Sequence, residues 1–167
     1  MPPLSQDHLE RLRSACRRSD GERAGLAAVH LQRDQALSVH PFRAAVEARD
    51  AAAMEAQLAD DVVFTSPVAF KPYPGKPITA AILRGVMRVF ENFRYVREIA
   101  DGRDHALVFE AEVDGKAITG CDFLHTNDDG LIDDFMVMVR PLSAATALAA
   151  RMGAEFDRIA SEAAASS

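Results

Sequence analysis

The sequence predicts an α+β fold in which helices gather on one face of an antiparallel sheet. Apolar residues recur with helical spacing in three segments, at 41–58, 78–90 and 143–164. Three Asp-Gly pairs divide residues 93–140, and this pair favours tight hairpins because both of its positions adopt positive φ angles. Residues 93–140 are therefore predicted to form a meander of four antiparallel strands.

The first elements begin at residues with clear local roles. Pro41 suits the first turn of a helix, and Asp50 can cap a second helix over 51–58. The β-branched and aromatic run at 62–65 predicts a strand. The prolines within 67–77 predict a constrained loop that can hold one short strand.

The length and spacing also suggest how the chain is divided. The 167 residues suffice for one core and are too few for two. Residues 1–39 are predicted to be a helical or partly disordered extension, and residues 40–155 the main domain. Residues 156–167 are predicted to be the end of the last helix and a frayed tail.

Composition excludes several classes of protein. Lys and Arg total 19 against 25 Asp and Glu, and this net charge of -6 argues against a nucleic-acid partner. No apolar run reaches the roughly 18 residues of a membrane span, and no signal peptide is present, so a cytoplasmic location without membrane contact is predicted. Cys16 and Cys121 lack metal-site spacing. We expect neither a metal nor a cofactor.

Two hairpin registers place one carboxyl group on an apolar face. If Asp114-Gly115 is a two-residue turn, Leu107 opposes Asp122, and if Asp129-Gly130 is another, Asp122 opposes Val137. Directly opposed residues share a face of the sheet. The face that both registers give to Asp122 is otherwise apolar and collects Leu107, Phe109, Ala111, Val113, Ile118, Leu124, Phe135, Val137 and Val139.

Asp122 is the candidate catalytic residue. A carboxyl group among apolar side chains loses its hydration, so its pKa should rise. Such perturbed groups are candidates for functional sites. The structural alternative is that an amide, Arg or Tyr of the covering layer satisfies the carboxyl group.

The opposite face of the sheet is mixed in character. Its centre holds an apolar patch formed by Cys121, Phe123, Met136 and Met138. Such a patch on an outer face predicts cover by a second subunit, and hence a homodimer. His125 opposes Asp134 in the same register, which predicts an ordinary surface ion pair.

The loop at Asp101-Gly102 leaves two registers open for the strand before it. An odd number of loop residues turns three side chains toward the inner face, Phe93, Tyr95 and Ile99. An even number turns Arg94, Val96 and Glu98 there, which gives Asp122 charged neighbours. The apolar set favours the odd count.

Four stretches carry a family resemblance: His40 to Asp50, LADDVVFTSPVAFKPYPGKPI at 58–78, GCDFLHTNDDGLIDDF at 120–135 and MVRPL at 138–142. With them, residues 40–155 resemble a SnoaL-like domain of the nuclear transport factor 2-like superfamily. The resemblance implies a cone, in which a strongly curved antiparallel sheet wraps around a deep pocket that helices close. The fold alone does not determine function, because it hosts enzymes, binding proteins and dimerisation modules.

The resemblance also supplies a test of chemistry. Ketosteroid isomerases of this fold use a tyrosine in the first helix, a base aspartate after the first strand and an aspartic acid in the penultimate strand. Phe42, Ser66 and Asp122 occupy these positions, so two of the three groups are absent, which argues against ketosteroid isomerisation. SnoaL-like polyketide cyclases rely chiefly on one pocket aspartate, and Asp122 is similar in placement.

We therefore expect a site for a hydrophobic small molecule. The enzymatic hypothesis is a cofactor-independent isomerase, cyclase or lyase acting on a carbonyl compound, with Asp122 as acid and base. The alternative is a non-catalytic module that binds a ligand or dimerises. Gly120 is expected to leave space on the pocket wall. The expected ligand contacts are Phe42, Phe64, Ser66, Phe70, Tyr73, Leu107, Phe109, Gly120, Leu124, Phe135 and Val137.

Overall fold

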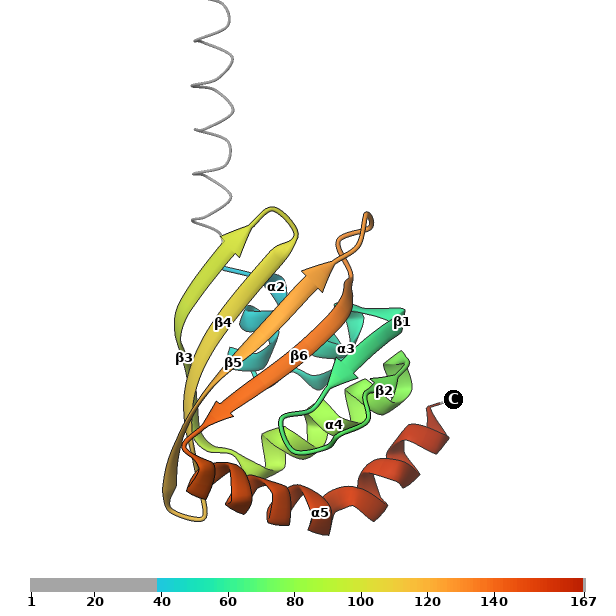
Figure 1. Ribbon diagram of the computed structural model, residues 1–167. Helices are drawn as coiled ribbons and strands as arrows, with labels where there is room; N and C mark the ends of the chain where they lie inside the picture. The colour runs from blue at the N-terminus through green and yellow to red at the C-terminus, as the bar shows by residue number, and fades with distance from the viewer. Residues whose placement is uncertain (1–38, 167) are drawn as a thin grey trace, which may run out of the picture. The chain divides into compact units, whose positions relative to one another are not determined.

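A computed structural model describes residues 39–166 and gives the predicted α+β architecture (Figure 1). The predicted extension at 1–39 lies outside the described residues, except for Val39. The elements are, in chain order, α2 (Pro41–Glu47), α3 (Ala51–Ala56), β1 (Leu58–Thr65), β2 (Tyr73–Pro74), α4 (Lys76–Val89), β3 (Glu91–Asp101), β4 (Asp104–Val113), β5 (Lys116–Thr126), β6 (Ile132–Arg140) and α5 (Leu142–Ala165).

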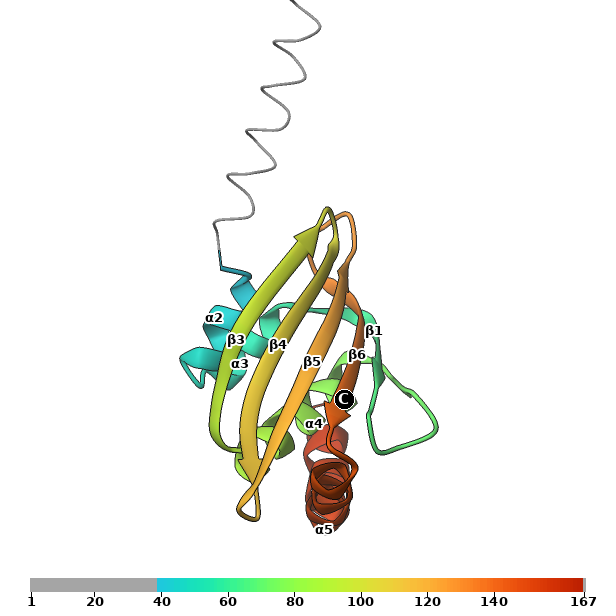
Figure 2. The same cartoon turned by 60° about the vertical axis from the view of Figure 1, so that its left-hand side comes forward.

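The strands form one curved sheet in the order β2-β1-β6-β5-β4-β3 (Figures 1 and 2). Strands β3 to β6 make the predicted meander, and β1 joins its β6 edge in parallel. Helices α2, α3 and α4 lie behind the sheet in the view of Figure 1, and α5 runs below its lower end. No helix within residues 39–166 is long and apolar enough to cross a membrane.

Local capping explains where the first helices begin. Pro41 occupies the first turn of α2, and Nδ1 of His40 accepts a hydrogen bond from the Phe42 N–H at 3.1 Å. Asp50 caps α3 as predicted, because its Oδ1 accepts from the Ala53 N–H at 3.0 Å. Helix α3 ends at Ala56, earlier than predicted, since the chain already enters β1 at Leu58.

The registers that place Asp122 are confirmed. Asp122 pairs with Leu107 on one side and with Val137 on the other. Asp114 and Gly115 both have positive φ, as a two-residue turn requires. The apolar face predicted around Asp122 is the inner face, and its Leu107, Phe109 and Phe135 are almost completely buried.

The predicted two-residue turn at Asp129-Gly130 is wrong. Pairing ends at Thr126 and Ile132, and the loop between them is organised by Asn127. The side-chain Oδ1 of Asn127 accepts from the N–H groups of Asp129 and Leu131, each at 3.0 Å. A register shift next to this loop compensates for its length, so the pairing around Asp122 is the predicted one.

The same irregularity corrects the expected partner of His125. The shift lies between the His125–Asp134 and Thr126–Ile132 pairs, which leaves Asp133 as the extra residue. Nδ1 of His125 lies 2.6 Å from Oδ1 of Asp133, so its ion-pair partner is Asp133 and not Asp134.

The hairpin between β3 and β4 has features of both registers that the sequence left open, the even and the odd loop count. Asp101 pairs with Asp104 around a two-residue loop, so the preferred odd count is wrong and Ile99 is 55% exposed. A register shift between Tyr95 and Arg97 then inserts one extra residue. Tyr95 consequently opposes Phe109 and faces inward, as the odd count required.

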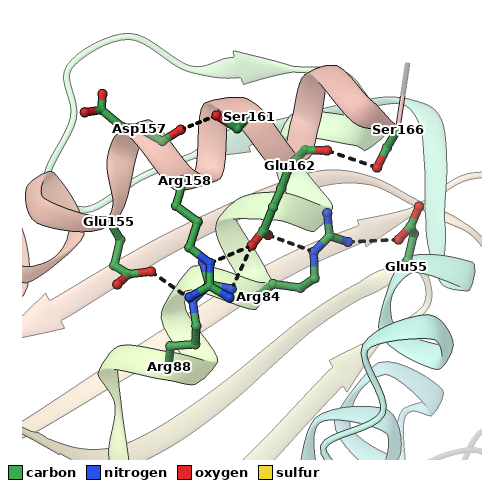
Figure 3. A network of polar contacts seen from close by, with 9 residues as sticks. All are labelled: Glu55, Arg84, Arg88, Glu155, Asp157, Arg158, Ser161, Glu162 and Ser166. Carbon is green, nitrogen blue, oxygen red and sulfur yellow. Dashed lines mark hydrogen bonds and ion pairs between the residues drawn. The ribbon is translucent and has the colours of Figure 1, made fainter.

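Helix α5 continues to Ala165, through most of residues 156–167, which were predicted to be the end of the last helix and a frayed tail. Ile159 is 1% exposed and packs so closely on α4 that a methyl group at Gly85 would lie 2.7 Å from it. Charged side chains reinforce this packing (Figure 3). We name them the α4–α5 ion-pair cluster, which consists of Glu55, Arg84, Arg88, Glu155, Arg158 and Glu162.

The outer face of the sheet keeps the apolar patch that the sequence indicates. Met138 is 54% exposed and Phe123 is 38% exposed, while Cys121 and Met136 are half-buried. The homodimer stays a prediction.

Candidate functional site

A cavity of about 230 Å³ lies between the inner face of the sheet and the helices. Aromatic and aliphatic side chains form most of its wall, and the sheet contributes Phe64, Phe93, Phe109 and Phe135. Four lining side chains carry a hydroxyl or carboxyl group: Ser66, Tyr73, Tyr95 and Asp122. A concave apolar site with few polar groups is the usual form of a small-molecule site.

Asp122 is buried in this wall and has one hydrogen-bond donor. Its side chain is on β5, and the residue is only 6% exposed. Its Oδ2 accepts a hydrogen bond from the Tyr95 hydroxyl at 2.7 Å. Burial raises the pKa of Asp122 to about 7, although the Tyr95 hydrogen bond acts in the opposite direction.

Tyr95 is a neutral partner for this carboxyl group. Burial and the charge of Asp122 raise the pKa of Tyr95 well above its ordinary value, so the phenol keeps its proton. The Arg43 guanidinium of α2 lies 5.8 Å from the centre of the Tyr95 ring, within the range of a cation–π contact. Arg43 is itself paired with Glu47 and Glu98, which hold it over the ring.

Asp122 can take up or release a proton near neutral pH. A carboxyl group with a pKa of about 7 is present in both of its protonation states there. The protonated form can donate a hydrogen bond to a ligand oxygen, and the ionised form can accept a proton from a ligand carbon. The surrounding apolar wall strengthens both interactions, because it excludes water.

Most of the predicted site residues meet at the cavity. Besides Asp122, its wall includes Phe42, Phe64, Ser66, Tyr73, Phe109, Phe135 and Val137. Phe42, at the position where the resemblance expects a tyrosine, is 1% exposed and packs edge-to-face on Phe135. The tyrosine hydroxyl comes instead from β3.

Four predicted contacts lie elsewhere. Phe70 is fully exposed on the loop before β2. Leu107 and Leu124 are buried in the core beside the cavity and do not line it. Gly120 makes room for a ring of the protein itself, because a methyl group there would lie 2.2 Å from Cζ of Phe109.

The predicted contacts omitted the part of the wall that α4 and α5 form, and the pairing of Tyr95 with Asp122. The side chains of α5 that line the cavity include four large ones at helical spacing: Leu148, Met152, Phe156 and Ile159. This spacing was a readable signal of an apolar face. The extra residue in β3 that turns Tyr95 inward has no signature in the local sequence.

The described part of the chain holds no group of three or more His, Cys, Asp or Glu side chains arranged to bind a metal ion. The donors that face the cavity are one carboxyl group and three hydroxyl groups.

Comparison with known proteins decides the family. The family model of the SnoaL-like domain matches residues 39–135, more than half of the chain. This protein belongs to the SnoaL-like family. The SnoaL-like chain is 40% identical to a steroid delta-isomerase from Pseudomonas aeruginosa, with a TM-score of 0.68. That match covers 72% of this chain and 89% of the other.

Two further structures extend the comparison. A protein from Silicibacter pomeroyi, described as conserved in bacteria with a cystatin-like fold, is 36% identical with a TM-score of 0.67. It matches over 71% of the SnoaL-like chain and 87% of its own. A putative ketosteroid isomerase from Kribbella flavida, at 21% identity, TM-score 0.50 and coverage of 60% and 73%, shows the shared fold alone. No curated protein matches the chain.

The predicted family and the predicted cone-shaped fold of the nuclear transport factor 2-like superfamily are thereby confirmed.

Proposed function

We propose that this SnoaL-like protein binds a hydrophobic carbonyl compound in its cavity and moves a proton on it, with Asp122 as the single acid and base. The observation that carries the proposal is the buried Asp122–Tyr95 pair on an otherwise apolar wall. No cofactor is required for this chemistry.

The proton transfer can be written for the groups at hand. Ionised Asp122 takes a proton from the carbon next to the carbonyl, and the electron pair of the broken C–H bond forms the enolate. Once Asp122 is protonated, the Tyr95 hydroxyl is free to donate to the enolate oxygen. Return of the same proton to another carbon of a conjugated enolate gives the isomer. Attack of the enolate carbon on a second carbonyl closes a ring, and the alkoxide formed from that carbonyl takes the proton back from Asp122.

One relative supports this class of reaction. The relative from Pseudomonas aeruginosa at 40% identity is named a steroid delta-isomerase. Isomerases of that kind also move a proton next to a carbonyl group. Ser66 stands where the resemblance expects a base, so Asp122 has to serve both as base and as acid.

One observation favours a second candidate function. Ser66 cannot act as a base at neutral pH, and its Oγ already accepts from the Val68 N–H at 3.2 Å. A cavity that keeps its polar pair and lacks a second base suits a ligand-binding module without turnover. The two candidates differ only in whether Asp122 exchanges its proton with the ligand.

Proton exchange in heavy water separates them. We expect the protein to bind α-tetralone and to catalyse deuterium entry at the carbon next to its carbonyl, as measured by NMR. The rate should rise with pH and level off above a midpoint near pH 7, because the ionised form of Asp122 is the base. Asp122→Asn should lower the catalysed rate by about 10²–10⁴.

Asp134→Asn is the matched control, because Asp134 is exposed on the outer face of the adjacent strand. It should exchange at the wild-type rate. Binding without exchange above the buffer background would overturn the enzymatic proposal in favour of the binding module. Failure of α-tetralone and larger aromatic ketones to raise the melting temperature would overturn both.

A further inference from the structure

The cavity has a second polar end across the sheet from Asp122. Ser66 directly follows β1, and Tyr73 lies in β2 opposite Phe64. Both side chains line the cavity. Ser66 has the same parity along the chain as Phe64, so it points to the inner face, and Tyr73 shares that face by its pairing.

Strand pairing fixes how far apart the two ends are. Thr65 pairs with Met136, so Ser66 is level with Val137, and Val137 pairs with Asp122. The path from Ser66 to Asp122 therefore crosses two strand spacings of about 4.8 Å, or roughly 10 Å. Between the ends, the wall is apolar, with Phe64, Phe135 and Val137.

The hydroxyl groups at this end have unused hydrogen-bonding capacity. Ser66 uses one oxygen lone pair on the Val68 N–H, which leaves its proton available for donation. Among residues 39–166, the Tyr73 hydroxyl has no hydrogen-bond partner. Pro72 and Pro74 restrict the backbone on both sides of Tyr73, and its partly buried ring packs against the core.

The size of the cavity limits the ligand that can connect both ends. Sites for drug-sized ligands measure about 300–1,000 Å³. A cavity of about 230 Å³ lies below that range and suits a skeleton of about two fused rings. Two oxygen atoms on opposite sides of such a skeleton are separated by a distance similar to the span between Asp122 and Ser66.

We propose that Ser66 and Tyr73 form a second binding subsite, and that the ligand is a compact fused-ring compound with an oxygen function at each end. This inference rests on the proposed function, which assigns the first oxygen to Asp122 and Tyr95. The second oxygen is a hydroxyl or carbonyl group that accepts from Ser66 or Tyr73. The subsite sets ligand orientation and selectivity, while Asp122 carries the chemistry.

Two ketones test the subsite by calorimetric titration. One is α-tetralone, and the other is the same ketone with a phenolic hydroxyl on its aromatic ring, on the far side from the carbonyl. The added hydroxyl should tighten binding to the wild-type protein about three- to tenfold, the effect of one net hydrogen bond. This gain should disappear in a Ser66→Ala, Tyr73→Phe double variant and persist in Asp122→Asn.

The readout is a ratio of two affinities on the same variant, so a general loss of stability does not imitate the result. Ser143→Ala, an exposed serine at the start of α5, is the control and should keep the full gain. Equal binding of the two ketones by the wild-type protein would overturn the subsite and leave the proposed function standing. A gain that survives in the double variant would place the second oxygen elsewhere and also overturn it. Absence of binding by both ketones would overturn the proposed function together with the subsite.

Discussion

Two carboxyl groups of this protein, the buried Asp122 and the partly exposed Glu162, differ in the charge of their partners. Asp122 is 6% exposed and meets one neutral hydroxyl, whereas Glu162 is paired with three arginines of the α4–α5 ion-pair cluster. Burial raises the pKa of Asp122 to about 7. Burial also acts to raise the pKa of Glu162, but hydrogen bonds from Arg84 and Arg158 and the charge of Arg88 outweigh it, and the pKa is lowered.

The difference shows that burial and the charge of the partner together decide what a carboxyl group can do. Glu162 is fixed as an anion at neutral pH, so it can hold α5 on α4 and cannot transfer protons. Asp122 has no cation in hydrogen-bonding contact within the described residues, so its pKa stays near neutral pH, where a general acid or base is most effective. A structural role and the proposed chemical role are thus separated within one small domain by the choice between arginine and tyrosine.

The largest expected effect is on the pH dependence of stability. The pKa of Asp122 lies at about 7 in the folded state against 3.8 for the ordinary group, so its contribution is fully present below about pH 4 and is lost as the pH rises to about 8. We expect Asp122→Asn to gain about 4 kcal/mol relative to wild type over this interval. Urea unfolding at a series of pH values measures it, and a constant difference between the two proteins would contradict the buried, titrating carboxyl group.

A smaller effect is expected from the α4–α5 ion-pair cluster. Arg88→Met leaves Glu155 without its partner and should lower the free energy of unfolding by about 2 kcal/mol, between the values for surface and buried pairs. Arg151→Met is the control, because its pair with Asp114 is about half exposed and should contribute less than about 1 kcal/mol. Equal losses measured by urea unfolding for both variants would remove the distinction between the cluster and ordinary surface pairs.

The smallest effect concerns the neutral partner. Tyr95→Phe removes the hydrogen bond that opposes the effect of burial, so the pKa of Asp122 should rise above about 7. The cost in stability at acidic pH should be about 1 kcal/mol, because one hydrogen bond is lost. NMR titration of the Asp122 side-chain carbon measures the shift, with Tyr73→Phe as the control that leaves it unchanged. A fall in this pKa would show that Tyr95 is not a donor to Asp122.

The sequence predicts the parts of this site that local interactions determine better than the parts that depend on distant residues. The position of Asp122 follows from turn chemistry at Asp114-Gly115, which acts over a few residues and fixes the register of a whole strand. The preferred register predicted the inward direction of Tyr95, but that direction arises from the extra residue in β3 and not from the odd loop count on which the prediction depended. Loop length also misled the prediction at Asp129-Gly130, where the Asn127 side chain organises a longer turn.

Because β3 contains an extra residue, we expect the strand to tolerate the loss of one residue better than the gain of one. Tyr95 and Glu98 are three positions apart, a spacing that in a regular strand points side chains in opposite directions, yet both lie on the inner face here. Removal of Val96 would restore regular pairing and keep both side chains where they are. Insertion of one more residue would either turn Tyr95 outward or, with regular pairing, move it along β4 beyond Phe109, and both outcomes should leave Asp122 without its donor. Among close relatives that use the carboxyl group of Asp122, we therefore expect some to lack a residue at position 96 and none to carry an insertion in this part of β3.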